Sequence, residues 1–272
     1  MKLTLKNIGK IGTASVEING ITVIAGENNT GKSTVGRAFF AVFNSFCNVQ
    51  RQIENERVDS VENLLDRMYI NSNPRFMRIA NTNEIAKTIV AHIDLYRQAE
   101  LSDMQKKITD LLFQYDEGKI ESFDEKTITE TVSRIKDILN VSDMEFLESV
   151  LERRLDAEFN EQVCNIFSGN DGEIHLQIKD ATITVSVENE GCINIQNPSN
   201  ISLHTEVVYL DDPFVLDDSN MFYRRIPRTS TDHRSHLRKK LFWSDSEANV
   251  FDEIIAKDKL NSIYEKISSV CS

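Results

Sequence analysis

The chain has 272 residues, of which 40% are hydrophobic and 27% are charged, and its formal net charge is −12. This composition predicts a globular protein with a substantial core, and no apolar run is long enough to cross a bilayer. The charged N-terminus lacks the apolar core of a signal peptide, so we expect a cytoplasmic protein with no membrane partner.

Period-two patterning predicts strands at the N-terminus. Leu3, Leu5 and Ile8 alternate with polar residues, and an extended pattern resumes over residues 14–18. Asn19 followed by Gly20 is a strong turn signal. Residues 21–25 are a β-branched apolar run, which predicts a strand buried on both faces in the middle of a sheet.

Residues 26–33 match the phosphate-loop pattern G-x-x-x-x-G-K-[ST] at every fixed position. The predicted strand precedes them, and an almost wholly apolar helix, predicted inside the domain, follows over residues 35–46. Glycines let such a loop turn its amides inward, and the following helix adds its positive N-terminal end. The expected nucleotide-binding residues are Gly26, Glu27, Asn28, Asn29, Thr30, Gly31, Lys32, Ser33 and Thr34.

These residue types predict binding of ATP together with Mg²⁺. We expect the Lys32 ammonium to hold the β- and γ-phosphate oxygens, which makes it the predicted catalytic residue. The Ser33 hydroxyl is expected to coordinate the metal ion.

The remaining chain divides by its patterning. Residues 48–168 show apolar residues at three- and four-residue spacing, which predicts an inserted array of amphipathic helices broken near Pro74 and Gly118. Period-two segments at 174–178, 182–187 and 192–195 predict a meander of strands, and residues 206–210 predict one more apolar strand. The expected segments are 1–47 for the phosphate-loop core, 48–168 for the insertion, 169–218 for strands returning to the sheet, and 219–272 for a basic segment and C-terminal helix.

Residues 1–46 resemble the N-terminal lobe of the RecF/SMC-like branch of the ABC ATPases, including the overcoming-lysogenization-defect type. The resemblance rests on the strand pair KLTLKNIGKIGTASVEI and the loop segment GITVIAGENNTGKST. It implies an α/β P-loop NTPase lobe with a mixed sheet and an inserted, mainly helical subdomain. It also implies an ATP-dependent dimer that couples hydrolysis to work on DNA or on a partner enzyme, as in DNA repair or anti-phage defence.

Members of that family complete the site with a signature loop of the LSGGQ kind and a Walker B strand that ends in carboxylates. The one Walker B candidate is residues 207–210 followed by Asp211 and Asp212, with Asp211 predicted to bind Mg²⁺ through water and Asp212 to replace the usual glutamate. Residues 186–206 contain no LSGGQ-like sequence, and no apolar strand follows Asp212. We therefore favour a structural core strand, keep the metal ligands as the alternative, and expect a chain that lacks the C-terminal part of a full ATPase.

Scattered side chains carry weaker predictions. Four cysteines without a CxxC pair predict neither a zinc site nor a disulfide framework. His233 and His236 lie in a polar, basic stretch and are interpreted as solvated loop residues rather than metal ligands. Residues 224–240 are basic enough to contact DNA, although a solvated surface or a subunit contact is favoured.

Three functions are compatible with the sequence. The first is an ATPase of the RecF/SMC-like kind, acting as a homodimer or with a partner subunit. The second is a regulatory module whose nucleotide occupancy switches a partner without hydrolysis by this chain. The third, a P-loop kinase, is disfavoured by the hairpin before the loop and by the long helical insertion.

Overall fold

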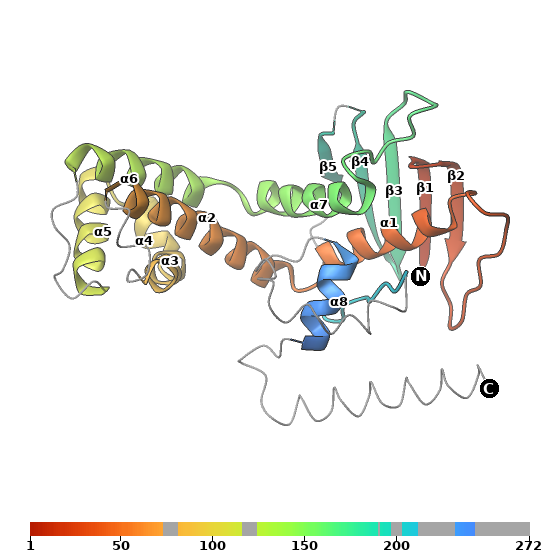
Figure 1. Cartoon of the computed structure of the whole chain (residues 1–272), viewed down its shortest axis with the longest axis horizontal. Coiled ribbons are helices and arrows are strands. Elements are labelled where there is room, and N and C mark those ends of the chain that lie inside the picture. Colours follow the sequence, from red (N-terminus) through yellow and green to blue (C-terminus); the bar gives the residue numbers. More distant parts are fainter. Residues whose placement is uncertain (73–80, 116–123, 190, 197–202, 212–231, 243–272) are drawn as a thin grey trace. The chain divides into compact units, whose positions relative to one another are not determined.

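The computed structural model describes residues 1–72, 81–115, 124–189, 191–196, 203–211 and 232–242 (Figure 1). The chain forms two compact units. The sheet unit comprises Met1–Asn44, Arg153–Cys192 and Glu206–Ser272, and the helical unit comprises Ser45–Glu152 and Ile193–Thr205. The predicted division into four segments stays a prediction.

Five strands form one sheet in the order β2-β1-β3-β4-β5. They are β1 (Lys2–Ile8), β2 (Ile11–Glu17), β3 (Gly172–Ile178), β4 (Ala181–Val187) and β5 (Ile193–Gln196). The predicted N-terminal strands and the later meander are confirmed. The pairings of β1 with β2, of β1 with β3 and of β3 with β4 are antiparallel, so the prediction of a mixed sheet is wrong.

The register places apolar side chains on one face of the sheet. Leu5 of β1 lies opposite Ile174 of β3, which in turn lies opposite Val185 of β4, and all three are buried. The other face carries polar side chains, including Lys6, whose ammonium pairs with the Glu173 carboxylate at 2.7 Å. An antiparallel sheet of this kind needs cover on one face only.

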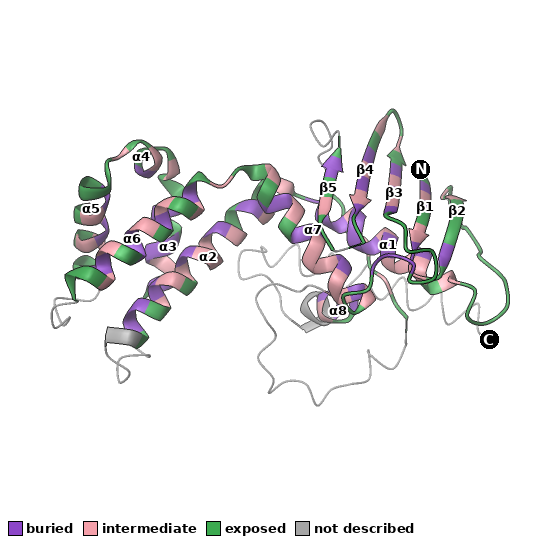
Figure 2. Cartoon of the chain, turned by 90° about the horizontal axis from the view of Figure 1, so that it is seen from above, coloured by how far each residue is buried: buried purple, intermediate pink, exposed green. Residues whose placement is uncertain are grey.

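Helix α1 (Lys32–Ser45) lies against the sheet (Figures 1 and 2). Ala38, Phe40 and Val42 are almost wholly inaccessible to solvent. The predicted apolar helix inside the domain is therefore confirmed, and the helix begins directly after the glycine-rich loop.

Two predicted strands are absent from the sheet. Residues 21–25 form no strand, and their side chains are exposed, with Ile21 at 94% and Val23 at 82%. Residues 206–210 also form no strand. Instead, this segment is held along α1, because the Asn44 side-chain amide exchanges two 2.7 Å hydrogen bonds with the backbone of Val207. The predictions of a buried central strand before the loop and of a core strand before Asp211 are both wrong.

The helical unit builds its own core. Its helices are α2 (Val49–Ser72), α3 (Thr82–Ala91), α4 (Ile93–Gln98), α5 (Leu101–Tyr115), α6 (Glu125–Asn140) and the greater part of α7 (Asp143–Phe159), whose last turns belong to the sheet unit. Leu65, Ile89, Met104 and Ile135 are all fully buried within one apolar cluster. The predicted helical array is confirmed, and α2 and α5 end close to the predicted breaks.

Helix α8 (His233–Phe242) is the last described element. Asp232 caps its N-terminus, because its carboxylate accepts hydrogen bonds from the Ser235 amide at 2.9 Å and from the Ser235 hydroxyl at 2.7 Å. Residues 212–231 and 243–272, which hold the first part of the basic segment 224–240 and the end of the predicted C-terminal segment, lie outside the described residues. In the described part of the chain, no helix is both long and apolar enough to cross a membrane.

Candidate functional site

The loop over residues 26–31 turns sharply into α1. Asn29 and Gly31 have positive φ angles of 69° and 89°. A Cβ atom on Gly31 would lie 2.8 Å from Cγ1 of Ile11, so glycine is required here both for its backbone angle and for space. The Thr30 hydroxyl donates to the Glu27 carbonyl at 2.8 Å and closes the loop. Gly26 has no positive φ angle, so the sequence argument for a special turn there is not supported.

Two lysine side chains donate hydrogen bonds to the loop. The Lys32 ammonium donates to the Gly26 carbonyl at 2.8 Å and also to the Glu27 carbonyl. An ammonium has three N–H donors, so these contacts use two of them. From the turn between β1 and β2, the Lys10 ammonium donates to the side-chain carbonyl of Asn29.

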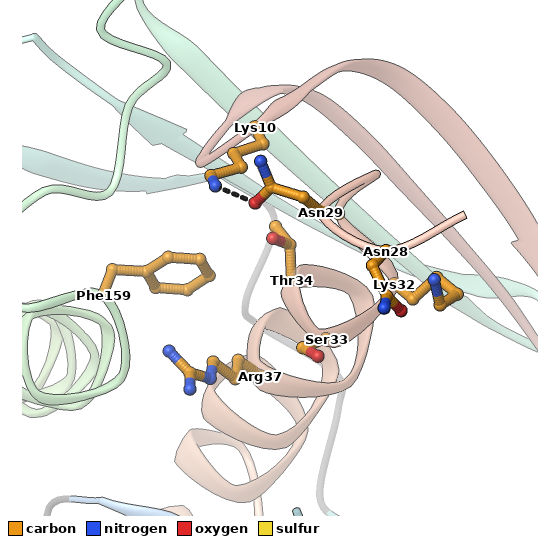
Figure 3. Close-up of a pocket in the computed structure, with 9 residues that line it drawn as sticks. Lys10, Asn28, Asn29, Lys32, Ser33, Thr34, Arg37 and Phe159 are labelled. Atoms are coloured by element: carbon orange, nitrogen blue, oxygen red, sulfur yellow. Dashed lines mark hydrogen bonds between the residues drawn. The ribbon is translucent and has the colours of Figure 1, made fainter. Parts of the chain in front are cut away.

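A pocket of about 340 Å³ opens at the start of α1 (Figure 3). Its lining comprises Lys10, Asn28, Asn29, Gly31, Lys32, Ser33, Thr34, Arg37 and Phe159. The lining includes three cationic side chains and no carboxylate, and the N-terminal end of a helix adds further positive potential. The chemistry of the pocket therefore suits an anion with several oxygen acceptors.

The structure divides the predicted nucleotide-binding residues into two groups. Asn28, Asn29, Gly31, Lys32, Ser33 and Thr34 line the pocket, whereas Gly26, Glu27 and Thr30 shape the loop beside it. Sequence reasoning missed Lys10, Arg37 and Phe159 as lining residues. Lys10 lies in the turn between β1 and β2, and this position near the loop in sequence is a weak indication that it lines the pocket. Nothing in the sequence indicates that Phe159 does so.

The predicted metal ligands are not brought into one cluster. Ser33 is exposed at the pocket, and Asp212 lies outside the described residues. Among the described residues, no group of three histidine, cysteine or carboxylate side chains is placed to hold a metal ion. The roles of Ser33, Asp211 and Asp212 in binding Mg²⁺ therefore stay predictions.

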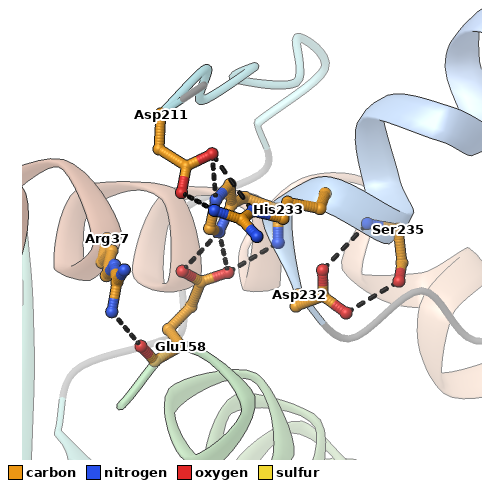
Figure 4. A network of polar contacts seen from close by, with 7 residues as sticks. Arg37, Glu158, Asp211, Asp232, His233 and Ser235 are labelled. Atoms are coloured by element: carbon orange, nitrogen blue, oxygen red, sulfur yellow. Dashed lines mark hydrogen bonds and ion pairs between the residues drawn. The ribbon is translucent and has the colours of Figure 1, made fainter. Parts of the chain in front are cut away.

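Asp211 is engaged by two side chains of α8 (Figure 4). Arg234 donates to its carboxylate through Nη2 at 2.6 Å and through Nε at 3.2 Å, and Nε2 of His233 lies 3.1 Å from Oδ1. The hydrogen bonds from Arg234 lower the pKa of Asp211 from its ordinary value of 3.8 to about 2. Asp211 is thus held as a carboxylate inside an ion-pair network.

Glu158 is the buried centre of this network. Its side chain has no exposed surface, and its oxygens lie 2.9 and 2.8 Å from Nδ1 of His233. One oxygen also accepts from the His233 backbone N–H at 2.6 Å. Burial raises the pKa of the Glu158 carboxyl above its ordinary value, since desolvation disfavours the charged form.

His233 and His236 are both 7% exposed, so the interpretation as solvated loop residues is wrong. The ring of Phe40 lies edge-on to both, with centroids 6.1 and 5.4 Å away, and Tyr209 lies 4.8 Å from His233. His233 contacts Glu158, which lies 75 residues earlier in the chain.

The network reaches the pocket through Arg37. Nη1 of Arg37 donates to the backbone carbonyl of Glu158 at 3.0 Å, and the same side chain lines the pocket (Figure 4).

The segment predicted to contact DNA, residues 224–240, includes Arg234, whose guanidinium is paired with the Asp211 carboxylate. Of the basic residues in this segment whose side chains are described, none is thus free to act as a simple surface cation.

Comparison with known proteins identifies no relative: no family model matches the chain, and neither a curated protein nor a solved structure matches it.

Proposed function

We propose that this chain binds ATP with Mg²⁺ in the pocket at the start of α1. The observation that carries the proposal is that Lys10, Lys32 and Arg37 line one pocket beside the loop whose sequence matches the phosphate-loop pattern. A triphosphate offers many oxygen acceptors and several negative charges, which matches such a lining. A simple monoanion would leave most of these donors unused.

Five residues that line the pocket have distinct parts in this proposal. Lys32 keeps one N–H for phosphate while two others hold the loop, and Arg37 and Lys10 extend the positive surface along the nucleotide. Ser33 would hold Mg²⁺, which would neutralise charge on the phosphate oxygens. Gly31 would let the backbone approach the phosphates closely.

We further propose that the sheet unit is a P-loop NTPase lobe of the RecF/SMC-like kind. In this proposal it forms a dimer or joins a partner subunit in the cytoplasm, where Cys47, Cys164 and Cys192 would stay reduced. ATP binding or hydrolysis would then be coupled to DNA repair or anti-phage defence. The support is the resemblance of residues 1–46 together with the loop-to-helix geometry.

A second function, a nucleotide-dependent switch without hydrolysis, is favoured by one specific observation. Asp211, the predicted carboxylate of a hydrolytic site, is bound by Arg234 and His233. The contacts from Arg37 to Glu158, and from Glu158 to His233, instead provide a direct route from the pocket to α8. Occupancy of the pocket would then alter how α8 is held.

Isothermal titration with Mg-ATP tests nucleotide binding. Lys32→Ala should weaken binding by about tenfold or more, because it removes a charged hydrogen bond to phosphate. Lys126→Ala is the matched control, since this lysine of α6 is 82% exposed, and it should bind as the wild type does. Equal binding by Lys32→Ala and the control would contradict the proposal.

Phosphate release, measured with and without double-stranded DNA, separates the two functions. DNA-stimulated release that Lys32→Ala abolishes supports the ATPase. Tight Mg-ATP binding without turnover in either condition supports the switch.

A further inference from the structure

One wall of the pocket differs in chemistry from the rest. Phe159, the last residue of α7, is half-buried and lines the pocket that Thr34 and Arg37 also line (Figure 3). Apart from Gly31, the other lining side chains are all polar or charged. Phosphate oxygens need hydrogen-bond donors, which a phenyl ring does not provide. The ring is therefore suited to an apolar or aromatic part of the ligand rather than to its phosphates.

The ring is held in a defined place relative to the loop. Its Cε1 atom lies 3.4 Å from the position that a Cβ atom on Gly9 would occupy, so it contacts the turn between β1 and β2 closely. The Gly9 amide donates to the Val163 carbonyl at 2.8 Å, which joins the segment after α7 to the same turn. Arg37 holds the carbonyl of Glu158, the residue before Phe159. Three separate contacts thus fix the end of α7 against β1 and α1.

The two ends of the pocket suit the two ends of a nucleotide. In Figure 3, Asn28 and Lys32 lie on one side of the start of α1 and Phe159 lies on the other, with Thr34 between them and the Arg37 guanidinium on the side of Phe159. A nucleobase presents a flat π face that stacks on an aromatic side chain, whereas its phosphates need the cationic loop.

We propose that Phe159 is the platform on which the base of the bound nucleotide stacks. This inference rests on the proposed nucleotide site, because the ring acts only on a ligand whose phosphates the loop holds. Stacking reads the face of the base and not its edge, so ATP and GTP depend on Phe159 to a similar degree.

Isothermal titration with two ligands tests the platform. Mg-ATP carries a base, and Mg-tripolyphosphate carries the same phosphates without one. Phe159→Leu keeps an apolar side chain but removes the ring, so it should weaken Mg-ATP binding by about 5- to 100-fold. Its affinity for Mg-tripolyphosphate should stay within about twofold of the wild type, because the phosphate contacts are unchanged. Phe159→Tyr keeps the ring and should bind Mg-ATP as the wild type does.

The controls separate a failed platform from a failed site. Phe113→Leu makes the same substitution at a phenylalanine of α5 that is 48% exposed, and it should change neither affinity. If Phe159→Leu lowers both affinities equally, or neither, the platform is wrong while the nucleotide site stands. If the wild type binds neither ligand, the proposed function fails and the platform fails with it.

A fluorescence measurement covers the case in which Phe159→Leu does not fold. The chain has a single tryptophan, Trp243. Combining Phe159→Trp with Trp243→Phe therefore places the only indole at the pocket. Mg-ATP should quench its emission by stacking, and Mg-tripolyphosphate should not. Equal responses to the two ligands would overturn the proposal.

Discussion

The helical unit and the sheet unit both have a buried apolar core, but their most exposed apolar side chains differ in solvent exposure. In the helical unit, Leu65, Ile89 and Met104 lie in one closed cluster without solvent exposure. In the sheet unit, Ile21 and Val23 are largely exposed, whereas the carboxylate of Glu158 is fully buried. Exposed apolar segments and buried charges both cost stability, so packing alone does not explain these features of the sheet unit.

Truncation of a core side chain should lower the free energy of unfolding more than any other change proposed here. Leu65→Ala should lower the free energy of unfolding by about 3 kcal/mol, because it leaves a cavity in a closed cluster. Leu210→Ala, at a side chain that is 45% exposed, should cost less than about 1 kcal/mol. Urea unfolding followed by circular dichroism measures both. Equal losses would show that Leu65 does not lie in a closed core.

The buried carboxylate should have a smaller effect. Glu158→Gln should cost about 1 kcal/mol, because the loss of charged hydrogen bonds to His233 is partly offset by the removal of a buried charge. The same change at exposed Glu161 is the matched control and should stay within about 0.5 kcal/mol of the wild type. If thermal unfolding shows no difference between the two variants, the network around His233 does not hold α8.

The loop should respond to a single methyl group. Gly31→Ala places a Cβ atom in a left-handed backbone conformation and 2.8 Å from Ile11, so it should cost about 1 kcal/mol or slightly more. Gly26→Ala meets only an ordinary 3.5 Å contact with Thr30 and should be nearly neutral for stability. Denaturant midpoints compare the two, and a larger loss for Gly26→Ala would show that the loop has a different conformation.

Acid should weaken the sheet unit through Asp211. Its pKa is lowered to about 2 by Arg234, below the ordinary 3.8, so its contribution to stability is present above 3.8 and is lost as the pH falls toward 2. Asp211→Asn should reduce stability near neutral pH and flatten the loss of stability at acid pH.

Glu158 has the opposite effect on the pH dependence. Burial raises the pKa of its carboxyl, so the contribution of this group to stability rises as the pH falls through that raised pKa. Urea unfolding across an acid pH series measures both slopes, and identical curves for variant and wild type would exclude the ion pair.

Much of the fold could be predicted from local patterns. Leu3, Leu5 and Ile8 show the period of a half-buried strand, and the three- and four-residue spacing of Ile108 and Leu112 shows that of an amphipathic helix. The loop before Lys32 could be predicted because it matches a pattern with a fixed spacing of glycine, lysine and serine.

The errors come from partners that are distant in the sequence. The apolar run around Val23 has the composition of a central strand, but only neighbouring strands can make it one. The polar neighbours of His233 in the sequence predict a solvated side chain, whereas Glu158 and Phe40 contact it and bury it. Phe159 joined the pocket through the end of α7, which no local pattern connects to the loop.

Hydrogen exchange with and without Mg-ATP tests the central claim most directly, because it locates the ligand on the chain. We predict slower amide exchange in peptides that cover residues 26–34, since phosphate would accept from those N–H groups, and unchanged exchange in the core helices α2 and α6 of the helical unit. Lys32→Ala should abolish the protection. Protection confined to the helical unit, or none anywhere at saturating Mg-ATP, would contradict the account.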